Sequence, residues 1–312
     1  MPATKAVKAQ RPKARTASLS LVVVGVGLAG VLALVLPRLL SPGGPGGPAL
    51  AVLETADFHA LAFSPEDPNV VFFGHHNGVM RSTDGGRTWQ PVVSRPNFDA
   101  MALAVSPANP RRIYLAGHNI FVVSPDGGMT WEPVRHNLPY DDIHGFALSP
   151  QDPNRLYAFV VGHGLFISRD GGTTWTRLST ALPQDVMSLA AAGGEPEVLF
   201  AGSMASGVLK SVDGGQTWQP SNSGLGSRRV MAVAVNPADS QVVYAGTDEG
   251  LYRSDDGGAS WRQLPFPGRN AAVVAVNPAS PDLVLAIEAA GPRQGRLYRS
   301  RDGGLSWGGE VR

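Results

Sequence analysis

The stretch "RSTDGGRTWQPV", from Arg81 to Val92, decides the fold, because close copies of its centre occur six times in the 312-residue chain. The copies read "STDGGRTW" (82–89), "SPDGGMTW" (124–131), "SRDGGTTW" (168–175), "SVDGGQTW" (211–218), "SDDGGASW" (254–261) and "SRDGGLSW" (300–307). Successive aspartates lie 42, 44, 43, 43 and 46 residues apart, and all six tryptophans of the chain lie in the copies. So regular a period predicts a repeat architecture.

Each repeat carries four short strand patterns separated by turn signals. An apolar segment ends at Ser-Pro or Asn-Pro, and a turn then leads to a second strand such as "VVFF" (70–73). A glycine-containing loop precedes a third strand such as "LYRS" (251–254), after which the Asp-Gly-Gly turn reverses the chain into a fourth. Four strands in 42–46 residues match one propeller blade. Residues 49–312 are therefore predicted to form an all-β, six-bladed β-propeller of four-stranded antiparallel blades.

The repeated turn has a structural explanation. Gly85 and Gly86 can adopt the positive φ that a tight turn requires, and Asp84 can accept hydrogen bonds from the amides of the turn. Trp89 supplies a large apolar body that anchors the outer edge of the blade to its neighbour. The same structural roles are predicted for the equivalent residues of all six copies: Asp84, Asp126, Asp170, Asp213, Asp256, Asp302, Trp89, Trp131, Trp175, Trp218, Trp261 and Trp307.

The sixth repeat lacks an obvious fourth strand. Only "WGGEVR" (307–312) follows its turn, and two of these residues are glycines. Counting back one period from the first complete repeat places Ala49–Leu53 where a fourth strand belongs. We predict that this segment pairs with the last blade and closes the ring.

The N-terminal region predicts a membrane anchor. Five basic residues precede "LSLVVVGVGLAGVLALVL" (Leu19–Leu36), whose 18 residues span roughly 27 Å as a helix, close to the thickness of a bilayer core. The basic residues predict a cytoplasmic N-terminus over 1–18, a transmembrane helix over 19–40, a Pro/Gly tether over 41–48 and a periplasmic or cell-surface propeller. The alternative is a cleaved signal peptide, whose nearest small-residue site is "ALA" at 49–51.

The composition excludes two kinds of site. Residues 52–312 hold 20 basic and 25 acidic residues, so the predicted propeller lacks the basic surface of a nucleic-acid-binding protein. The chain has no cysteine, which excludes disulfides and thiolate metal sites.

The pattern S-x-D-G-G-x-T/S-W resembles the Asp-box, or BNR, repeat of sialidase-like, sortilin-like and photosystem-assembly-factor-like propellers. The longer segment "DIHGFALSPQDPNRLYAFVVGHGLFISRDGGTTW" (142–175) is also similar to exported bacterial BNR-repeat proteins described as glycosyl hydrolases. The resemblance implies the propeller fold and two alternative functions, namely glycoside hydrolysis and a role in binding or assembly of other proteins.

The residues favour the non-catalytic alternative. The resemblance to sialidases implies three arginines, a Tyr–Glu pair and an Asp on the inner strands and the loops near the axis. The six innermost strand patterns contain none of these residue types: "ALAFS", "ALAVS", "GFALS", "SLAAA", "AVAVN" and "VVAVN". The sequence fixes no pairing among the loop carboxylates Asp141, Asp142, Asp248 and Glu288. We therefore assign no catalytic residue and predict a module that binds a protein or glycan partner on its central face, with a sialidase-like or other exo-glycosidase as the alternative.

Histidine and methionine recur at the position that opens each innermost strand. This column reads His59, Met101, His144, Met187, Met231 and Ala272, and the column two residues earlier reads Asp57, Asp99, Asp142, Asp185, Arg229 and Asn270. Loops predicted on the same face add His75, His76, His118 and His163. Imidazole with thioether suits copper, and imidazole with carboxylate suits zinc or Cu(II).

The candidate metal ligands are His59, His144, His75, His118, His163, Met101 and Met187. Ordinary packing of the methionines, and turn capping by the histidines and aspartates, is the alternative interpretation.

Overall fold

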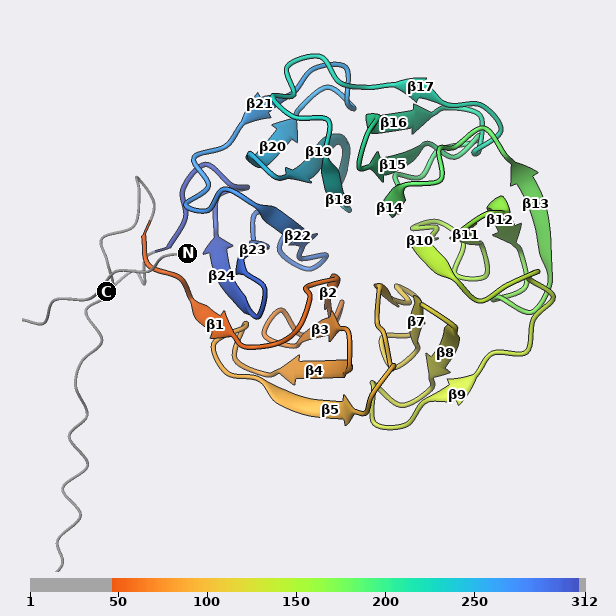
Figure 1. The fold of residues 1–312 in the computed structure, drawn as a ribbon, viewed down its shortest axis with the longest axis horizontal. Coiled ribbons are helices and arrows are strands. Elements are labelled where there is room, and N and C mark those ends of the chain that lie inside the picture. The colour runs from red at the N-terminus through yellow and green to blue at the C-terminus, as the bar shows by residue number, and fades with distance from the viewer. Residues whose placement is uncertain (1–46, 309–312) are drawn as a thin grey trace, which may run out of the picture. The chain divides into compact units, whose positions relative to one another are not determined.

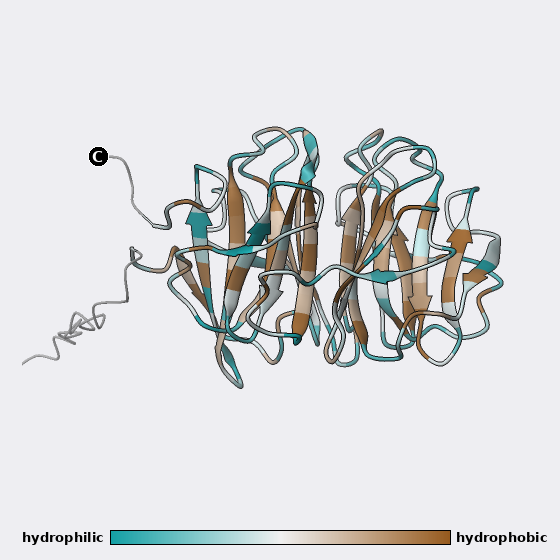
Figure 2. Ribbon diagram, turned by 90° about the horizontal axis from the view of Figure 1, so that it is seen from above, coloured by the Kyte–Doolittle hydropathy of each residue, from teal (hydrophilic) through white to brown (hydrophobic). Residues whose placement is uncertain are grey.

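The computed structural model describes residues 47–308, which form six four-stranded antiparallel sheets arranged around a central axis (Figure 1). This is the predicted all-β, six-bladed propeller. Apolar residues concentrate on the strands, and polar residues concentrate in the loops at the two faces of the disc (Figure 2). The innermost strands border the central channel, so the loops at their ends surround its two mouths.

The strands follow one another outward from the axis in five of the six blades. Blade one contains β2 (Ala60–Phe63), β3 (Val71–His75), β4 (Gly78–Ser82) and β5 (Gln90–Ser94). Blade two contains β6 (Ala102–Val105), β7 (Ile113–Gly117), β8 (Ile120–Ser124) and β9 (Glu132–Pro133). Blade three contains β10 (Ile143–Leu148), β11 (Leu156–Val160), β12 (Gly164–Ser168) and β13 (Trp175–Ser179).

Blades four and five repeat this order. Blade four contains β14 (Val186–Ala191), β15 (Leu199–Ser203), β16 (Gly207–Ser211) and β17 (Gln219–Pro220). Blade five contains β18 (Val230–Asn236), β19 (Asp239–Thr247), β20 (Gly250–Ser254) and β21 (Arg262–Gln263).

Blade six closes the ring with a strand from the other end of the chain. It contains β22 (Ala271–Val276), β23 (Val284–Gly291), β24 (Gln294–Ser300) and β1 (Ala51–Leu53). Strand β1 is antiparallel to β24, with Ala51 opposite Leu297 and Leu53 opposite Gly295 (Figure 1). The predicted closure is confirmed, and it removes the open sheet edge that β24 would otherwise present.

The repeated Asp-Gly-Gly turns are held by the carboxylate of their aspartate. In blade one the Asp84 carboxylate accepts hydrogen bonds from the Ser82 and Thr88 hydroxyls, at 2.8 and 2.6 Å, and from the Arg87 and Thr88 amides. Gly85 and Gly86 have φ values of 71° and 93°, as the turn requires. Hydrogen bonds from the hydroxyl four residues further on lower the pKa to about 2 in the equivalent aspartates Asp126, Asp170, Asp213 and Asp256.

The six tryptophans lie between neighbouring blades. The core consists of six apolar clusters, and each cluster joins residues of two adjacent blades with the tryptophan of one of them. Trp261, for example, packs with Phe200 and Val208 of blade four, and its Nε1 donates a 2.8 Å hydrogen bond to the carbonyl oxygen of Ser221. The predicted anchoring of each blade to its neighbour is therefore observed.

The predicted cytoplasmic segment, the transmembrane helix and residues 41–46 of the predicted tether lie outside the described residues. Residues 47–308 contain no helix long and apolar enough to cross a membrane. Gly47, at the end of the predicted tether, donates a hydrogen bond to the Trp307 carbonyl at 2.8 Å, and Leu50 donates one to Leu297 at 2.7 Å.

Candidate functional site at the channel mouth

The residues that open the innermost strands meet at one mouth of the channel, as their shared position in the repeat predicts. A cavity of about 500 Å³ is lined there by five members of the column: His59, Met101, Met187, Met231 and Ala272. The sixth member, His144, lines a smaller adjoining cavity of about 100 Å³ together with four of these residues. The two cavities therefore occupy one continuous region of the channel.

Apolar side chains dominate the larger cavity. Four of its lining residues are methionines, and Met204, from the turn after β15, is one that the column did not include. Phe58, Gly291, Pro292 and three alanines add further apolar surface. The polar side chains that line it are Asp57, His59 and Asn270, so it contains a single carboxylate.

Beside this cavity, the buried carboxylate of Asp99 faces three histidines from two blades. Its side chain is 3 % exposed. Oδ2 lies 2.5 Å from Nδ1 of His118 and 3.1 Å from Nδ1 of His76, and Oδ1 lies 3.2 Å from Nε2 of His59. Burial by itself raises the pKa of Asp99, but the neighbouring imidazoles of His59 and His118 reverse this effect and hold the pKa well below its usual range.

A second contact joins His118 to blade three. Its Nε2 lies 2.9 Å from Nε2 of His144, and both nitrogens face Oδ1 of Asp142, at 3.7 and 3.3 Å respectively. His118 comes from the turn between β7 and β8, whereas Asp142 and His144 lie at the start of β10. Burial is the main cause of the lowered pKa of His144, which favours its neutral form.

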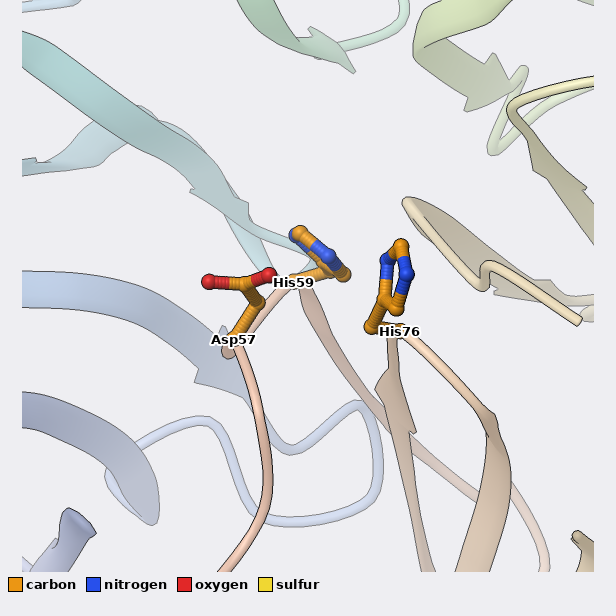
Figure 3. A group of neighbouring side chains, drawn as sticks. All are labelled: Asp57, His59 and His76. Carbon is orange, nitrogen blue, oxygen red and sulfur yellow. The ribbon is translucent and has the colours of Figure 1, made fainter. Parts of the chain in front are cut away.

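Asp57, His59 and His76 form a looser group on blade one (Figure 3). Figure 3 shows the first two on the segment that leads into β2 and the third on the turn after β3. One donor atom from each lies within 4.8 Å of the other two. His59 and His76 also contact Asp99, as described above, so Asp99 connects the two histidine groups.

The structure separates the seven predicted metal ligands. His118 and His144 face each other, whereas Met101 and Met187 line the cavities with His59. His75 lies one residue before His76, at the end of β3, and its ring stacks on Phe73 with the centroids 5.7 Å apart. Burial is the main cause of its lowered pKa. His163, in the turn between β11 and β12, belongs to neither histidine–aspartate group among the described residues.

Sequence reasoning missed the central role of Asp99 and the participation of His76. Both belong to a predicted column or loop set, but neither is among the candidate ligands, and turn capping was the alternative interpretation of the aspartates. Asp185 does have a local partner, since its Oδ1 accepts a 2.7 Å hydrogen bond from the Ser203 hydroxyl. Asp99, by contrast, is surrounded by imidazoles, and the four histidines predicted in the loops of one face were the available signal.

The remaining candidate carboxylates are engaged at separate places. Asp141 lies 3.3 Å from His136, and Asp248 lies 3.3 Å from Arg229. Glu288 accepts hydrogen bonds from Arg296 and Tyr298, both at 3.3 Å. None of these three carboxylates lines the mouth cavity.

Comparison with protein families gives one match that covers most of the propeller. The family model Sortilin-Vps10, described as sortilin, neurotensin receptor 3, matches residues 77–181 and 206–309. No curated protein matches the sequence.

Solved structures share the fold at low sequence identity. A GH74 enzyme from Niastella koreensis is 18 % identical with a TM-score of 0.56, and the match covers 80 % of this chain and 46 % of that enzyme. This chain thus spans about half the length of the GH74 enzymes that it matches. YCF48 bound to D1 peptide is 18 % identical with a TM-score of 0.52, and 86 % of each chain is covered.

A further similar structure is the extracellular domain of BT4673 from B. thetaiotaomicron. It is 14 % identical with a TM-score of 0.55, and the match covers 83 % of this chain and 34 % of that one. At these identities, the similarity of all three structures shows the fold alone.

Proposed function

This chain belongs to the Sortilin-Vps10 family of β-propellers, and we propose that it is a non-catalytic binding module that accepts an apolar segment of another protein at its channel mouth. The resemblance to sortilin-like propellers is confirmed by the family match. Since propellers support both binding and catalysis, the proposal depends on the residues at the mouth and not on the fold.

The methionine-lined cavity carries the proposal. Its volume of about 500 Å³ lies within the range of ligand sites in proteins. Methionine side chains are flexible and polarizable, so a surface built from them can repack around different apolar side chains. Four methionines around one mouth therefore suit an apolar peptide segment better than a sugar, whose hydroxyls need many hydrogen-bonding partners.

A solved propeller of the same fold supports a protein partner. YCF48 has been solved bound to a D1 peptide, and it matches this chain over 86 % of both lengths. The match to the GH74 enzyme from Niastella koreensis covers only 46 % of that enzyme. The peptide complex of YCF48 therefore supports a protein partner more directly than the GH74 match supports hydrolysis.

The mouth gives little support to the exo-glycosidase alternative. Two-carboxylate glycosidases need a general acid with a raised pKa and a second carboxylate about 5–10 Å away. The cavity contains one carboxylate, Asp57. The adjacent Asp99 has a lowered pKa, which is the opposite of what a general acid requires.

Replacing Met187 with glutamate tests the proposed binding surface. Peptides that carry apolar residues, selected from a random library with the purified full chain, are expected to bind Met187→Glu at least about tenfold more weakly, because a tenfold loss corresponds to only about 1.4 kcal/mol. Their dissociation constants are measured by fluorescence anisotropy. Met129→Glu is the matched control, since Met129 is 77 % exposed on the turn after β8. Equal affinities for both variants would contradict the proposal.

We further propose that residues 19–40 anchor the propeller outside the cytoplasmic membrane. Contacts at the start of the propeller support an intact N-terminus. The small-residue site at 49–51 overlaps β1, and cleavage there would separate Gly47 and Leu50 from their partners Trp307 and Leu297. An uncleaved anchor avoids this loss.

Fractionation of a bacterial host tests the anchor and its orientation. The full chain is expected in the membrane fraction, where protease added outside spheroplasts degrades the propeller. A variant that lacks residues 1–40 is expected in the soluble fraction and protected from the protease. Recovery of a soluble mature chain whose mass corresponds to cleavage near Ala51 would favour the signal peptide.

A further inference from the structure

We propose that His118, His144 and Asp142 bind one zinc ion between blades two and three. The site lies next to the proposed peptide-binding mouth, but it does not depend on that function. It differs from the set of ligands that the sequence suggested, because it contains a carboxylate and no thioether.

The three donor atoms have the spacing of ligands on a common small cation. Nε2 of His118, Nε2 of His144 and Oδ1 of Asp142 are separated by 2.9, 3.3 and 3.7 Å. A triangle with these sides has a circumradius of about 1.9 Å, and zinc binds nitrogen and carboxylate oxygen at about 2.0–2.2 Å. An ion slightly above the plane of the three atoms therefore contacts all of them without movement of the backbone.

The donor types select the metal. Two imidazoles and one carboxylate form a set that zinc uses in proteins, with a fourth position left to water or another ligand. Cu(I) prefers sulfur ligands, and the methionines line the cavities instead of joining this group. His118 is 42 % exposed, so solvent gives an ion access to the site.

The surroundings of His118 orient it for this role. Nδ1 of His118 donates a proton toward Asp99 at a distance of 2.5 Å. Metal-binding histidines commonly donate their second nitrogen to a carboxylate in this way, which directs the other nitrogen toward the metal. Asp99 is thus a positioning residue that lies behind the ligand.

Two hydrogen-bonding facts also point to an ion. If no ion is present, one imidazole Nε2 must donate to the other to explain their 2.9 Å separation. In that arrangement the Nε2 proton of His144 is shared with His118, and Oδ1 of Asp142, which lies 3.3 Å from the same nitrogen, is buried without a hydrogen bond of good geometry among the described residues. A buried carboxylate oxygen without a donor is costly, and a cation between the three atoms satisfies it.

The group on blade one is a weaker candidate. Asp57 is exposed, and His59 and His76 both contact Asp99, which already accepts the proton of His118. The donor atoms of Asp57, His59 and His76 lie within 4.8 Å of one another, whereas those of the proposed site are separated by 2.9–3.7 Å.

Zinc titration of the untagged full chain tests the proposal. After removal of metals with EDTA and buffer exchange, the chain is expected to bind one zinc ion, as measured by calorimetry and elemental analysis, and to melt at a higher temperature with zinc than without. His144→Ala and Asp142→Asn are expected to lose this stoichiometric ion. Asp99→Asn is expected to bind it about 10–100-fold more weakly, because the carboxylate behind a ligand contributes about that much.

His163→Ala is the matched control and is expected to bind zinc like the unmodified chain. Asp142→Asn preserves the shape of the side chain, and its melting temperature in EDTA separates loss of the ion from loss of folding. The proposal is overturned if the unmodified chain takes up no stoichiometric zinc. It is also overturned if His144→Ala and Asp142→Asn retain the ion, or if only His59→Ala or His76→Ala loses it. The zinc titrations contain no peptide, so none of these outcomes bears on the proposed peptide-binding function.

Discussion

Replacing Leu53 with alanine is expected to lower the melting temperature of the propeller by about 6–12 °C. Leu53 is 3 % exposed and belongs to the core cluster shared by blades six and one. Truncation of a buried leucine costs about 3 kcal/mol, and each kcal/mol corresponds to about 2–4 °C in a domain of this size. The effect is large for a three-residue strand because β1 joins the two ends of the ring.

Val52 provides a control on the same strand. It lies between Ala51 and Leu53 but is 49 % exposed, so Val52→Ala removes two methyl groups without opening a cavity in the core. Its melting temperature should stay within about 2 °C of the unmodified chain, as expected for a surface change of about 0.5 kcal/mol. Differential scanning calorimetry of the full chain measures both variants. Equal shifts for Leu53→Ala and Val52→Ala would show that closure by β1 contributes little to stability.

The second large effect is expected at Trp261. Its side chain is 5 % exposed and packs between blades four and five. Trp261→Ala should lower the free energy of unfolding by about 4 kcal/mol, because it removes the largest apolar group of that interface and leaves a cavity. Denaturant unfolding monitored by circular dichroism measures the change.

Two further variants separate the contributions of Trp261. Trp261→Phe keeps an aromatic ring but removes the hydrogen bond to the Ser221 carbonyl, for which a loss of about 1–3 kcal/mol is expected. Trp218→Ala is the comparison at the equivalent position of blade four. Trp218 is only partly buried, and its Nε1 bonds to Gly215 of its own turn, so its loss should cost less. A cost for Trp218→Ala equal to that for Trp261→Ala would contradict the interface argument.

The fold was predictable because its determinants are local and repeated. Each Asp-Gly-Gly turn contains its own hydrogen-bond acceptor and its own positive-φ glycines, so the sequence of one repeat is sufficient to recognise a blade. The constant period then determines the number of blades and the sequence position of the strand that the last repeat lacks. The pairing of Ala51–Leu53 with β24 was therefore predictable. The mouth column was predictable for the same reason, since equivalent positions of a propeller lie at equal height around the axis.

The arrangement within the mouth was decided by the tertiary structure. His75 and His76 are adjacent in sequence, yet the first, at the end of β3, stacks on Phe73, whereas the second, in the turn that follows, contacts Asp99. Asp99 has its histidine partners 19, 23 and 40 residues away, and two of them, His76 and His59, belong to the preceding blade, so its own repeat does not reveal that it faces three imidazoles.

The sequence by itself determined that this chain is a closed six-bladed ring with histidines and methionines at one mouth. Only the packing of blade two against blade three decided that His118, His144 and Asp142 meet, while Met101 and Met187 line the cavities. The physical reason is that a repeat period fixes where a residue lies around the axis, whereas the direction of its side chain depends on contacts with the neighbouring blade.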